Sequence, residues 1–378
     1  GSTSGGRIGS RRARGRARAL ALEISLLFAV MLATVGAFQM WWGGTAFPGR
    51  MLVSVLLLLA RDLLVGGRRA RALAIAMSSV AVAIVPAAIP TPDADGRAID
   101  VAALQVDVNS VQHLVGVEED IAVAQLNIDR HLRLAQDPPD LVVWGEGALD
   151  PGVSNDPSAM EEVSDAVASV GTPTIAGAVT DARDGTERTV TLAFDGTGAI
   201  VDRYEKVKLV PFGEYVPFRG ALGWISATDQ VAVDRTPGEE VTLISLPGLP
   251  KIGTPTCYEN SFPSIDREMT RLGAGILVVV INNASYERTA ASEQHLLMSR
   301  LRAAENGRWV VHAAVSGISA FIDEHGRVVD SRGLFEPATM RTMVRSSDRR
   351  TAYTRLGDWV PWGSIVLVVG LIAFPRGR

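Results

Sequence analysis

Three side chains capable of acid, base and nucleophile chemistry end short apolar runs of this 378-residue chain. Glu146 ends DLVVWGE, Lys206 ends IVDRYEK, and Cys257 ends KIGTPTC. Each run is typical of a strand, and strand ends in α/β folds deliver side chains into a crevice. A thiol attacks a carbonyl carbon as the thiolate, a carboxylate can take its proton, and an ammonium can stabilise an oxyanion. These three residue types therefore suit covalent catalysis at a carbonyl group.

Each of the three residues also has a structural interpretation. Glu146 could lie beside a helix N-cap, and Lys206 could be a solvated charge at a strand end. Cys257 is the only cysteine, so it forms no intrachain disulfide, and single cysteines are commonly buried as small hydrophobic side chains. Taken one at a time, the structural interpretation is favoured for all three.

The elements that must position these residues alternate between strands and helices. Apolar runs bounded by Gly, Asp and Pro predict strands, and apolar residues at helical spacing predict helices, with Gly307 as a stop signal. The alternation has no internal repeat and predicts a layered α/β domain. We expect strands at 99–108, 140–146, 172–179, 189–195, 198–209, 251–259, 275–283, 309–315, 318–323 and 326–330, and helices at 118–136, 158–170, 264–273 and 292–307.

Longer motifs surround the three residues. They are VVWGE, YEKVKLVPFGEYVPF at 204–218, GTPTCYENSFP at 253–263, and the stretch 282–319, which contains QHLLMSRLRAAENGR. Together they closely resemble the nitrilase superfamily and, within it, the bacterial apolipoprotein N-acyltransferases. The resemblance covers the whole domain. It implies an αββα sandwich of the nitrilase type, flanked by transmembrane helices, with a Glu–Lys–Cys catalytic triad.

The resemblance assigns the triad by motif. Glu146 occupies the acid of the family's W-P-E element, Lys206 precedes its L-V-P-F-G-E element, and Cys257 is the nucleophile of C-Y-E. Lys208 is a rival to Lys206, but the spacing to the PFGE segment selects Lys206. The supporting residues carried over in the same way are Glu214 in PFGEY, and Tyr258 and Glu259 in CYE.

The resemblance also implies a reaction. Cys257 would attack a phospholipid ester and release a lysophospholipid, and the amine of a diacylglyceryl-cysteine lipoprotein would then attack the thioester. Glu146 would be the general base, and Lys206 would face the oxyanion beside the backbone N–H of Tyr258. Glu214 would keep Lys206 oriented and charged, whereas Glu259 would orient neighbours of Glu146 or contact the substrate. No metal or organic cofactor is needed, and the five histidines show no ligand spacing, so they are interpreted as structural.

Apolar segments at both ends predict membrane spans. The run at 19–42 is long enough to cross a bilayer, and weaker candidates lie at 46–65, 72–90 and 359–375. The arginines of the tail 1–18, of the connector after residue 60 and of the last residues place these segments in the cytoplasm. We therefore expect a basic disordered tail (1–18), a membrane region with about three spans (19–91), an extracytoplasmic catalytic domain (97–346) and a C-terminal span (359–375).

The overall charge argues against one class of partner. The formal net charge is −4 and charged residues make up 21% of the chain, so no case arises for nucleic-acid binding. The expected partners are a phospholipid acyl donor, a lipoprotein acceptor and the membrane itself.

The chain departs from the family at several positions. Gly145 stands where the family has proline, which frees a backbone that the family fixes and could loosen Glu146. Ser285 and Tyr286 replace an aromatic pair, and Ser316 replaces an asparagine. The family also carries more spans before its catalytic domain than the three counted here.

Two other functions remain open at this point. A membrane-tethered amidase or nitrilase would use the same triad, with water as the second nucleophile. A non-catalytic membrane scaffold for another lipid-modifying protein would have no reason to retain Glu146, Lys206 and Cys257 together.

Overall fold

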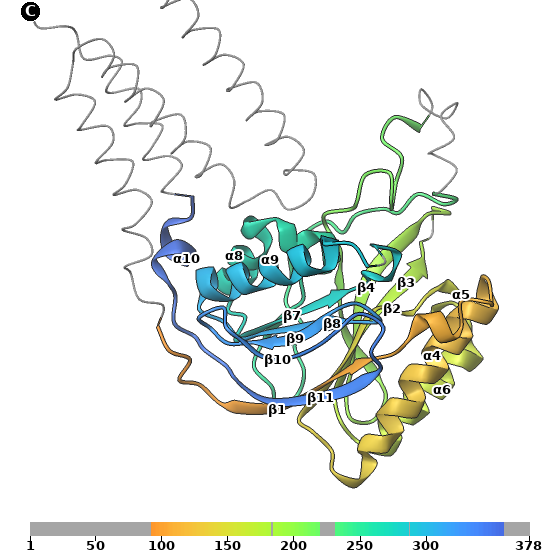
Figure 1. Ribbon diagram of the computed structural model, residues 1–378, viewed down its shortest axis with the longest axis horizontal. Helices are drawn as coiled ribbons and strands as arrows, with labels where there is room; N and C mark the ends of the chain where they lie inside the picture. Colours follow the sequence, from red (N-terminus) through yellow and green to blue (C-terminus); the bar gives the residue numbers. More distant parts are fainter. Residues whose placement is uncertain (1–91, 183, 220–230, 287, 359–378) are drawn as a thin grey trace, which may run out of the picture. The chain divides into compact units, whose positions relative to one another are not determined.

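The apolar runs in the middle of the chain form two mixed β-sheets (Figure 1). The computed structural model describes residues 92–182, 184–219, 231–286 and 288–358. The first sheet has the order β11-β1-β2-β3-β4-β5 and the second the order β10-β9-β8-β7-β6. The strands of the first sheet are β1 (Ala98–Gln105), β2 (Leu141–Leu149), β3 (Thr174–Asp181), β4 (Glu187–Phe194), β5 (Ile200–Glu205) and β11 (Ala338–Arg345). Those of the second are β6 (Ile252–Gly253), β7 (Ile276–Ile281), β8 (Val310–Ala314), β9 (Ser319–Ile322) and β10 (Val328–Arg332).

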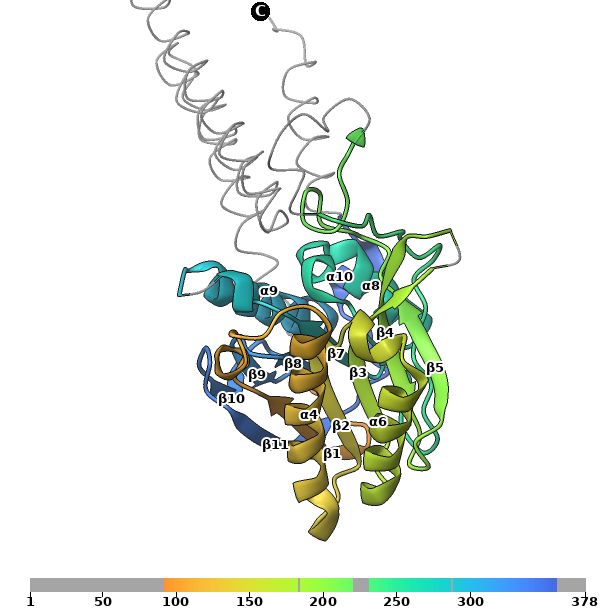
Figure 2. The same cartoon turned by 90° about the vertical axis from the view of Figure 1, so that its right-hand side faces the viewer.

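Helices cover the outer face of each sheet (Figures 1 and 2). Helices α4 (Val117–Leu132) and α6 (Pro157–Val170) pack on the first sheet, and α8 (Pro263–Leu272) and α9 (Ala291–Asn306) on the second. The resulting order, helix–sheet–sheet–helix, agrees with the expected αββα sandwich. The remaining helical elements are α5 (Pro151–Ser154), α10 (Ala352–Leu356) and the 3₁₀ turns η1 (Val108–Ser110), η2 (Arg133–Gln136), η4 (Cys257–Ser261) and η5 (Ala284–Tyr286).

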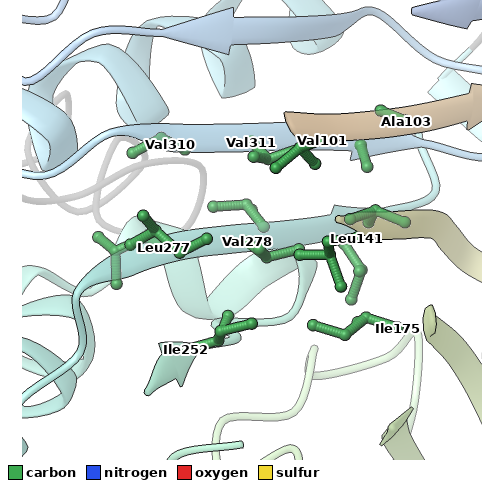
Figure 3. Close-up of a cluster of buried hydrophobic side chains, with 14 of the residues drawn as sticks. Val101, Ala103, Leu141, Ile175, Ile252, Leu277, Val278, Val310 and Val311 are labelled. Atoms are coloured by element: carbon green, nitrogen blue, oxygen red, sulfur yellow. The ribbon is translucent and has the colours of Figure 1, made fainter. Parts of the chain in front are cut away.

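The core lies mainly between the two sheets (Figure 3). Central strands are buried on both faces, which is why their sequences are almost continuously apolar. In β1, Val101 and Ala103 face the second sheet, whereas Ala102 and Leu104 face the helices. Every residue of β7 is buried. The packing of one sheet on the other therefore fixes where the ends of their strands meet.

Local signals explain the helix ends. The carboxylate of Asp156 accepts hydrogen bonds from the backbone N–H groups of Ser158 and Ala159 at the start of α6. Helices α6, α8 and α9 end at Gly171, Gly273 and Gly307, each with the left-handed backbone that glycine favours. The predicted stop at Gly307 is confirmed.

Some sequence-based strand boundaries were wrong, and one strand was missed. Strand β2 does not end at Glu146 but continues to Leu149, and the strand expected over 251–259 is reduced to Ile252–Gly253 before η4 begins at Cys257. Strand β11 was missed, although it pairs antiparallel with β1 along its whole length. Its alternate residues Met340 and Val344 are buried while Met343 is exposed, so the apolar alternation is broken on the outer face.

Within the described residues, no helix has the length and apolar character needed to cross a bilayer. The predicted basic tail (1–18), membrane region (19–91) and C-terminal span (359–375) all lie outside those residues.

Candidate active site

Lys206 lies between two carboxylates in the interior. It directly follows β5, its side chain is only 1% exposed, and its Nζ lies 2.8 Å from Oε1 of Glu214 and 3.2 Å from Oε1 of Glu146. Lys208, the rival in the sequence, is exposed and contacts the network only through its backbone N–H. The structure therefore brings Glu146 and Glu214 to Lys206 and not to Lys208.

Glu146 is presented by an irregularity in β2. Trp144 pairs with Ala176 of β3, but the next paired residue, Leu149, lies opposite Ala178. The intervening residues 145–148 thus lie opposite the single residue Gly177, and this bulge redirects Glu146 away from the regular pleat. The second carboxylate oxygen of Glu146 accepts a 3.0 Å hydrogen bond from the backbone N–H of Asn282, just after β7.

Close backbone approach requires glycine on both sides of Glu146. A Cβ at Gly145 would lie 2.1 Å from the backbone N of Val315, and a Cβ at Gly177 would lie 2.5 Å from the Cα of Glu146. This close packing does not support the expectation that Gly145 could loosen Glu146. Gly145 packs directly on the backbone after β8, where no side chain fits.

Cys257 occupies a strained turn at the start of η4. Thr256 forms an isolated parallel bridge with Val280 of β7, and Cys257 follows it with a φ of 50°, an unusual value for a residue other than glycine. Such conformations persist only where the surroundings impose them, and they cluster at functional sites. The charges of Glu146 and Lys206 both act on this thiol, so the turn delivers the sulfur to the acid and the cation.

Glu259 braces this turn and has no room to contact a substrate. Its side chain is fully buried and accepts hydrogen bonds from the hydroxyl of Tyr204 and the backbone N–H groups of Thr256, Val207 and Lys208. One carboxylate thereby links the residues that follow Lys206, at the end of β5, to the residue that precedes Cys257, at the start of η4. Of the two roles expected for Glu259, the geometry supports the orienting one.

Charges in the site favour a neutral thiol beside a charged lysine. Burial, then the charge of Glu146, raises the pKa of Cys257 despite the opposing effect of Lys206. Burial disfavours the charged form of Lys206, but Glu146 and Glu214 outweigh it and raise its pKa. Burial also opposes ionisation of Glu214, yet Lys206 and Arg235 hold its pKa below the usual range. The buried site therefore favours an S–H group at Cys257.

Two contributors to the site escaped the sequence analysis. Arg235 donates to Oε1 of Glu214 over 2.9 Å and so shares that carboxylate with Lys206. Asn282 contributes its backbone N–H to Glu146. No recognised motif includes Arg235, and a backbone donor leaves no trace in residue type, so neither was predictable from the sequence alone.

Tyr286, Tyr258 and Ser316, which the sequence analysis also named, are partly or fully buried. Tyr286 is half-buried in η5, where burial, then the charges of Cys257 and Glu146, raise its pKa. The side chain of Tyr258 packs edge-on against Phe262, with ring centroids 5.0 Å apart. Ser316 is fully buried, and its hydroxyl accepts a 3.2 Å hydrogen bond from the backbone N–H of Val108.

His325 is one of three neighbouring side chains that could together bind a metal ion, although its spacing in the sequence did not suggest such a site. His325 lies beside Asp93 and Glu324, from opposite ends of the domain. Its Nε2 is 2.9 Å from Asp93, and Glu324 accepts from the backbone N–H of Ala94, so these contacts explain the group without an ion.

A surface hollow of about 230 Å³ lies apart from the triad residues. Its two arginines, Arg188 and Arg203, are paired with Glu205 at 2.5 and 2.9 Å. The hollow includes none of Glu146, Lys206 and Cys257. Its lining residues are Arg188, Arg203, Glu205, Glu239, Glu240 and Thr242.

Known proteins resemble this chain in sequence and in fold. Apolipoprotein N-acyltransferase from Geobacter metallireducens is 31% identical over 247 residues, which cover 64% of this chain and 47% of that protein. The protein of the same name from Mycolicibacterium smegmatis is 32% identical over 296 residues, which cover 74% and 48%. The chain thus spans about half the length of these curated relatives.

Solved structures share the fold at low sequence identity. A mutant of the Nesterenkonia AN1 amidase from the nitrilase superfamily matches with a TM-score of 0.52 at 16% identity, over 71% of this chain and 96% of the amidase. Nit3 of Saccharomyces cerevisiae matches with a TM-score of 0.50 at 15% identity, over 75% and 97%. At these identities the likeness concerns the fold alone. The carbon-nitrogen hydrolase family model matches residues 110–353, about two thirds of the sequence. This chain belongs to the carbon-nitrogen hydrolase family, and its motifs resemble those of the apolipoprotein N-acyltransferases within it.

Proposed function

We propose that this protein is a membrane-anchored N-acyltransferase with Glu146, Lys206 and Cys257 as its catalytic triad. It would move a fatty acyl chain from a phospholipid to the N-terminal amine of a diacylglyceryl-cysteine lipoprotein. The observation that carries the proposal is the buried Cys257, whose thiol feels the charges of Glu146 and Lys206, two residues that form an ion pair. The similarity to relatives named apolipoprotein N-acyltransferase supports the choice of reaction within the family.

In the first half-reaction the sulfur of Cys257 attacks the ester carbonyl while Glu146 takes the thiol proton. The carbonyl oxygen becomes an oxyanion, which Lys206 and the backbone N–H of Tyr258 would stabilise. Collapse of this intermediate breaks the ester C–O bond, and Glu146 returns the proton to the departing lysophospholipid oxygen. The product on the enzyme is a Cys257 thioester.

In the second half-reaction the lipoprotein amine attacks the thioester carbonyl. Glu146, unprotonated again, takes a proton from the amine, and the thiolate leaves as the amide forms. The proton then returns to Cys257, so the site is restored. Glu214, held by Arg235, would keep Lys206 charged and oriented throughout both steps.

A membrane anchor suits two lipid-bearing substrates. The long apolar run at 19–42 and the shorter one at 359–375 flank the catalytic domain in the sequence. An enzyme held at the bilayer surface would meet both the phospholipid and the diacylglyceryl group without extracting either.

The direct test is intact-protein mass spectrometry of the full chain after incubation with phospholipid vesicles. We expect an added acyl mass that hydroxylamine removes, and no such mass on Cys257→Ser, which should remain folded. Equal acylation of Cys257→Ser would exclude Cys257 as the nucleophile. With wild-type protein, absence of the adduct would overturn phospholipid as the donor.

Product analysis separates acyl transfer from hydrolysis. Adding a synthetic diacylglyceryl-cysteine peptide should release the acyl group as an amide on that peptide. Release as free fatty acid at the same rate with and without the peptide would instead indicate water as the second nucleophile.

A further inference from the structure

A buried histidine contacts the backbone of the proposed nucleophile. His295, in α9, is only 6% exposed, and its Nε2 lies 2.9 Å from the carbonyl oxygen of Cys257. Its Nδ1 lies 3.1 Å from the side-chain oxygen of Asn283, which follows β7. The imidazole thus bridges the turn at Cys257 and the loop that supplies the backbone donor to Glu146.

The turn at Cys257 needs such a brace. A φ of 50° at a residue with a Cβ is intrinsically unfavourable, so neighbouring groups must hold it. On the N-terminal side, Thr256 and Glu259 form a reciprocal capping box. On the C-terminal side, the carbonyl of Cys257 is held by His295, which belongs to a different element.

The chemistry of the contact fixes the proton on the ring. A carbonyl oxygen can only accept, so Nε2 of His295 must carry the proton. Burial lowers the pKa of His295 to about 4, although the carbonyl of Cys257 opposes this effect, so the ring is neutral at pH 7. Nδ1 is then an acceptor and requires a donor from Asn283, whose Nδ2 has no partner among the described residues. Exchanging the two ends of that amide satisfies both groups, with Nδ2 donating to Nδ1.

A second contact, one turn along α9, strengthens the same interface. The Nδ2 of Asn260, in η4, donates to Ser299 over 2.8 Å, and Ser299 in turn lies 2.7 Å from Nδ1 of His312. Residues four apart share one helix face, so His295 and Ser299 together bind α9 to η4. Of these contacts, only that of His295 reaches Cys257 itself.

We propose that His295 is a positioning residue for Cys257: as the Nε2-protonated neutral tautomer, it fixes the Cys257 carbonyl and so holds the strained turn that carries the thiol. The inference rests on the proposed nucleophilic role of Cys257. It assigns His295 no contact with substrate and no proton transfer.

The test uses the fact that Cys257 is the only cysteine, so alkylation by iodoacetamide reports on this thiol alone. His295→Gln keeps a nitrogen donor near the position of Nε2, whereas His295→Asn keeps only the contact near Nδ1. The matched control is His312→Asn, because His312 is buried 5.5 Å from His295, ring to ring, and has no recorded contact with Cys257. Rates are measured at pH 7.5 on the full chain in membranes.

We expect His295→Asn to slow alkylation by about tenfold, the effect of one lost buried hydrogen bond, with His295→Gln and His312→Asn within about twofold of wild type. An unchanged or faster rate in His295→Asn, or equal losses in the Asn and Gln variants, would overturn the inference. Should His295→Asn not fold, nitrogen-15 NMR of the wild-type imidazoles still decides the matter. At pH 7 it must show His295 protonated at Nε2 only, and a ring protonated at Nδ1 would contradict the proposal.

Acylation by phospholipid vesicles, measured in parallel, separates the two proposals. Wild-type protein that is not acylated would sink the proposed function, while the alkylation series would still decide the role of His295. Acylated wild type with a fully active His295→Asn variant would leave the function standing and refute the positioning role.

Discussion

At the scale of single residues, the site is a balance of buried charges. Lys206 is one ammonium between Glu146 and Glu214, and Arg235 adds a second cation beside Glu214. Two acids with two cations leave the centre close to neutral, which makes burial of all four groups tolerable. Burial beside these charges favours the protonated thiol of Cys257.

Lys206, which is buried between the acids, can be compared directly with the exposed Lys208. Lys206→Ala should reduce activity by at least about a hundredfold, because the oxyanion loses its cation. It should also destabilise the fold by about 3 kcal/mol, because buried carboxylates lose their partner. Lys208→Ala, at an exposed side chain, should change activity by less than about twofold and stability by less than about 0.5 kcal/mol. Acyl-transfer rates and thermal unfolding of both variants check this, and similar losses in the two would show that the lysine register is wrong.

At the scale of elements, two local irregularities of the backbone position Glu146 and Cys257. The bulge in β2 turns Glu146 out of the sheet, and the 3₁₀ turn η4 does the same for Cys257. Helix α9 packs against η4 with a buried face that is largely polar. The buried residues on that face are Ser292, His295, Ser299, Arg302, Ala303 and Asn306, so hydrogen bonds rather than apolar area hold much of this helix in place.

The β2 bulge can be tested through its neighbour in β3. In Gly177→Ala the new methyl group would lie 2.5 Å from the Cα of Glu146, and backbone atoms cannot move aside cheaply. We expect a loss of about 1–3 kcal/mol in stability from overpacking and a fall of at least about tenfold in acylation, because Glu146 is displaced.

The control for this substitution is Gly171→Ala, at the end of α6. Its Cβ would meet nothing within 4 Å, but its φ of 73° makes alanine unfavourable. This variant should lose about 1 kcal/mol in stability and keep full activity. Full activity in Gly177→Ala would show that the bulge tolerates displacement of Glu146.

At the scale of the whole molecule, the residues of the proposed triad meet only when the two sheets are packed. Glu146 and Lys206 come from β2 and β5 of the first sheet, while Cys257 and Asn282 follow β6 and β7 of the second. The apolar layer between the sheets therefore sets the distances between Glu146, Lys206 and Cys257 (Figure 3).

Buried histidines on both sides of this layer make the fold sensitive to acid. Burial lowers the pKa of His131 in α4 and of His295 in α9 to about 4, and also lowers that of His312 in β8. His131 is fully buried against Trp144, with ring centroids 5.6 Å apart. In the unfolded chain such a histidine binds a proton below pH 6.5, whereas in the folded chain it does so only near pH 4. Its contribution to stability is therefore complete above pH 6.5 and is lost as the pH falls from 6.5 to 4.

His131→Phe isolates this effect from the acids that titrate in the same range. Between pH 7.5 and pH 4.5, wild type should lose about 2 kcal/mol more of its free energy of unfolding than the variant does. Urea unfolding at the two pH values measures the difference. Identical pH dependence in the two proteins would show that His131 is not held neutral.

Much of the fold follows from local pattern. Continuous apolar runs identified β1, β2, β7 and β8, because strands buried on both faces carry few polar residues. Gly307 marked the end of α9, because glycine adopts the left-handed backbone there at no steric cost. Strand β11 could not be found in this way, since its outward residues Thr339, Arg341 and Met343 mask the alternation, and its pairing with β1 joins segments more than 230 residues apart.

The residue types of the site were also determined by the sequence. Glu146, Lys206 and Cys257 stand at the ends of apolar runs within long motifs. The acid, the ammonium group and the thiol can therefore be recognised, in that order, from the sequence. Only the tertiary structure decided which groups meet. It joined Arg235 to Glu214, turned Glu259 into a brace and set His295 against the carbonyl of Cys257. The position of Lys206 rather than Lys208 between the acids agrees with the choice that the motif spacing had already made. Contacts of this kind join residues far apart in the sequence and depend on how the two sheets pack, which no local pattern specifies. Strands and helices, in contrast, depend mainly on neighbouring residues along the chain.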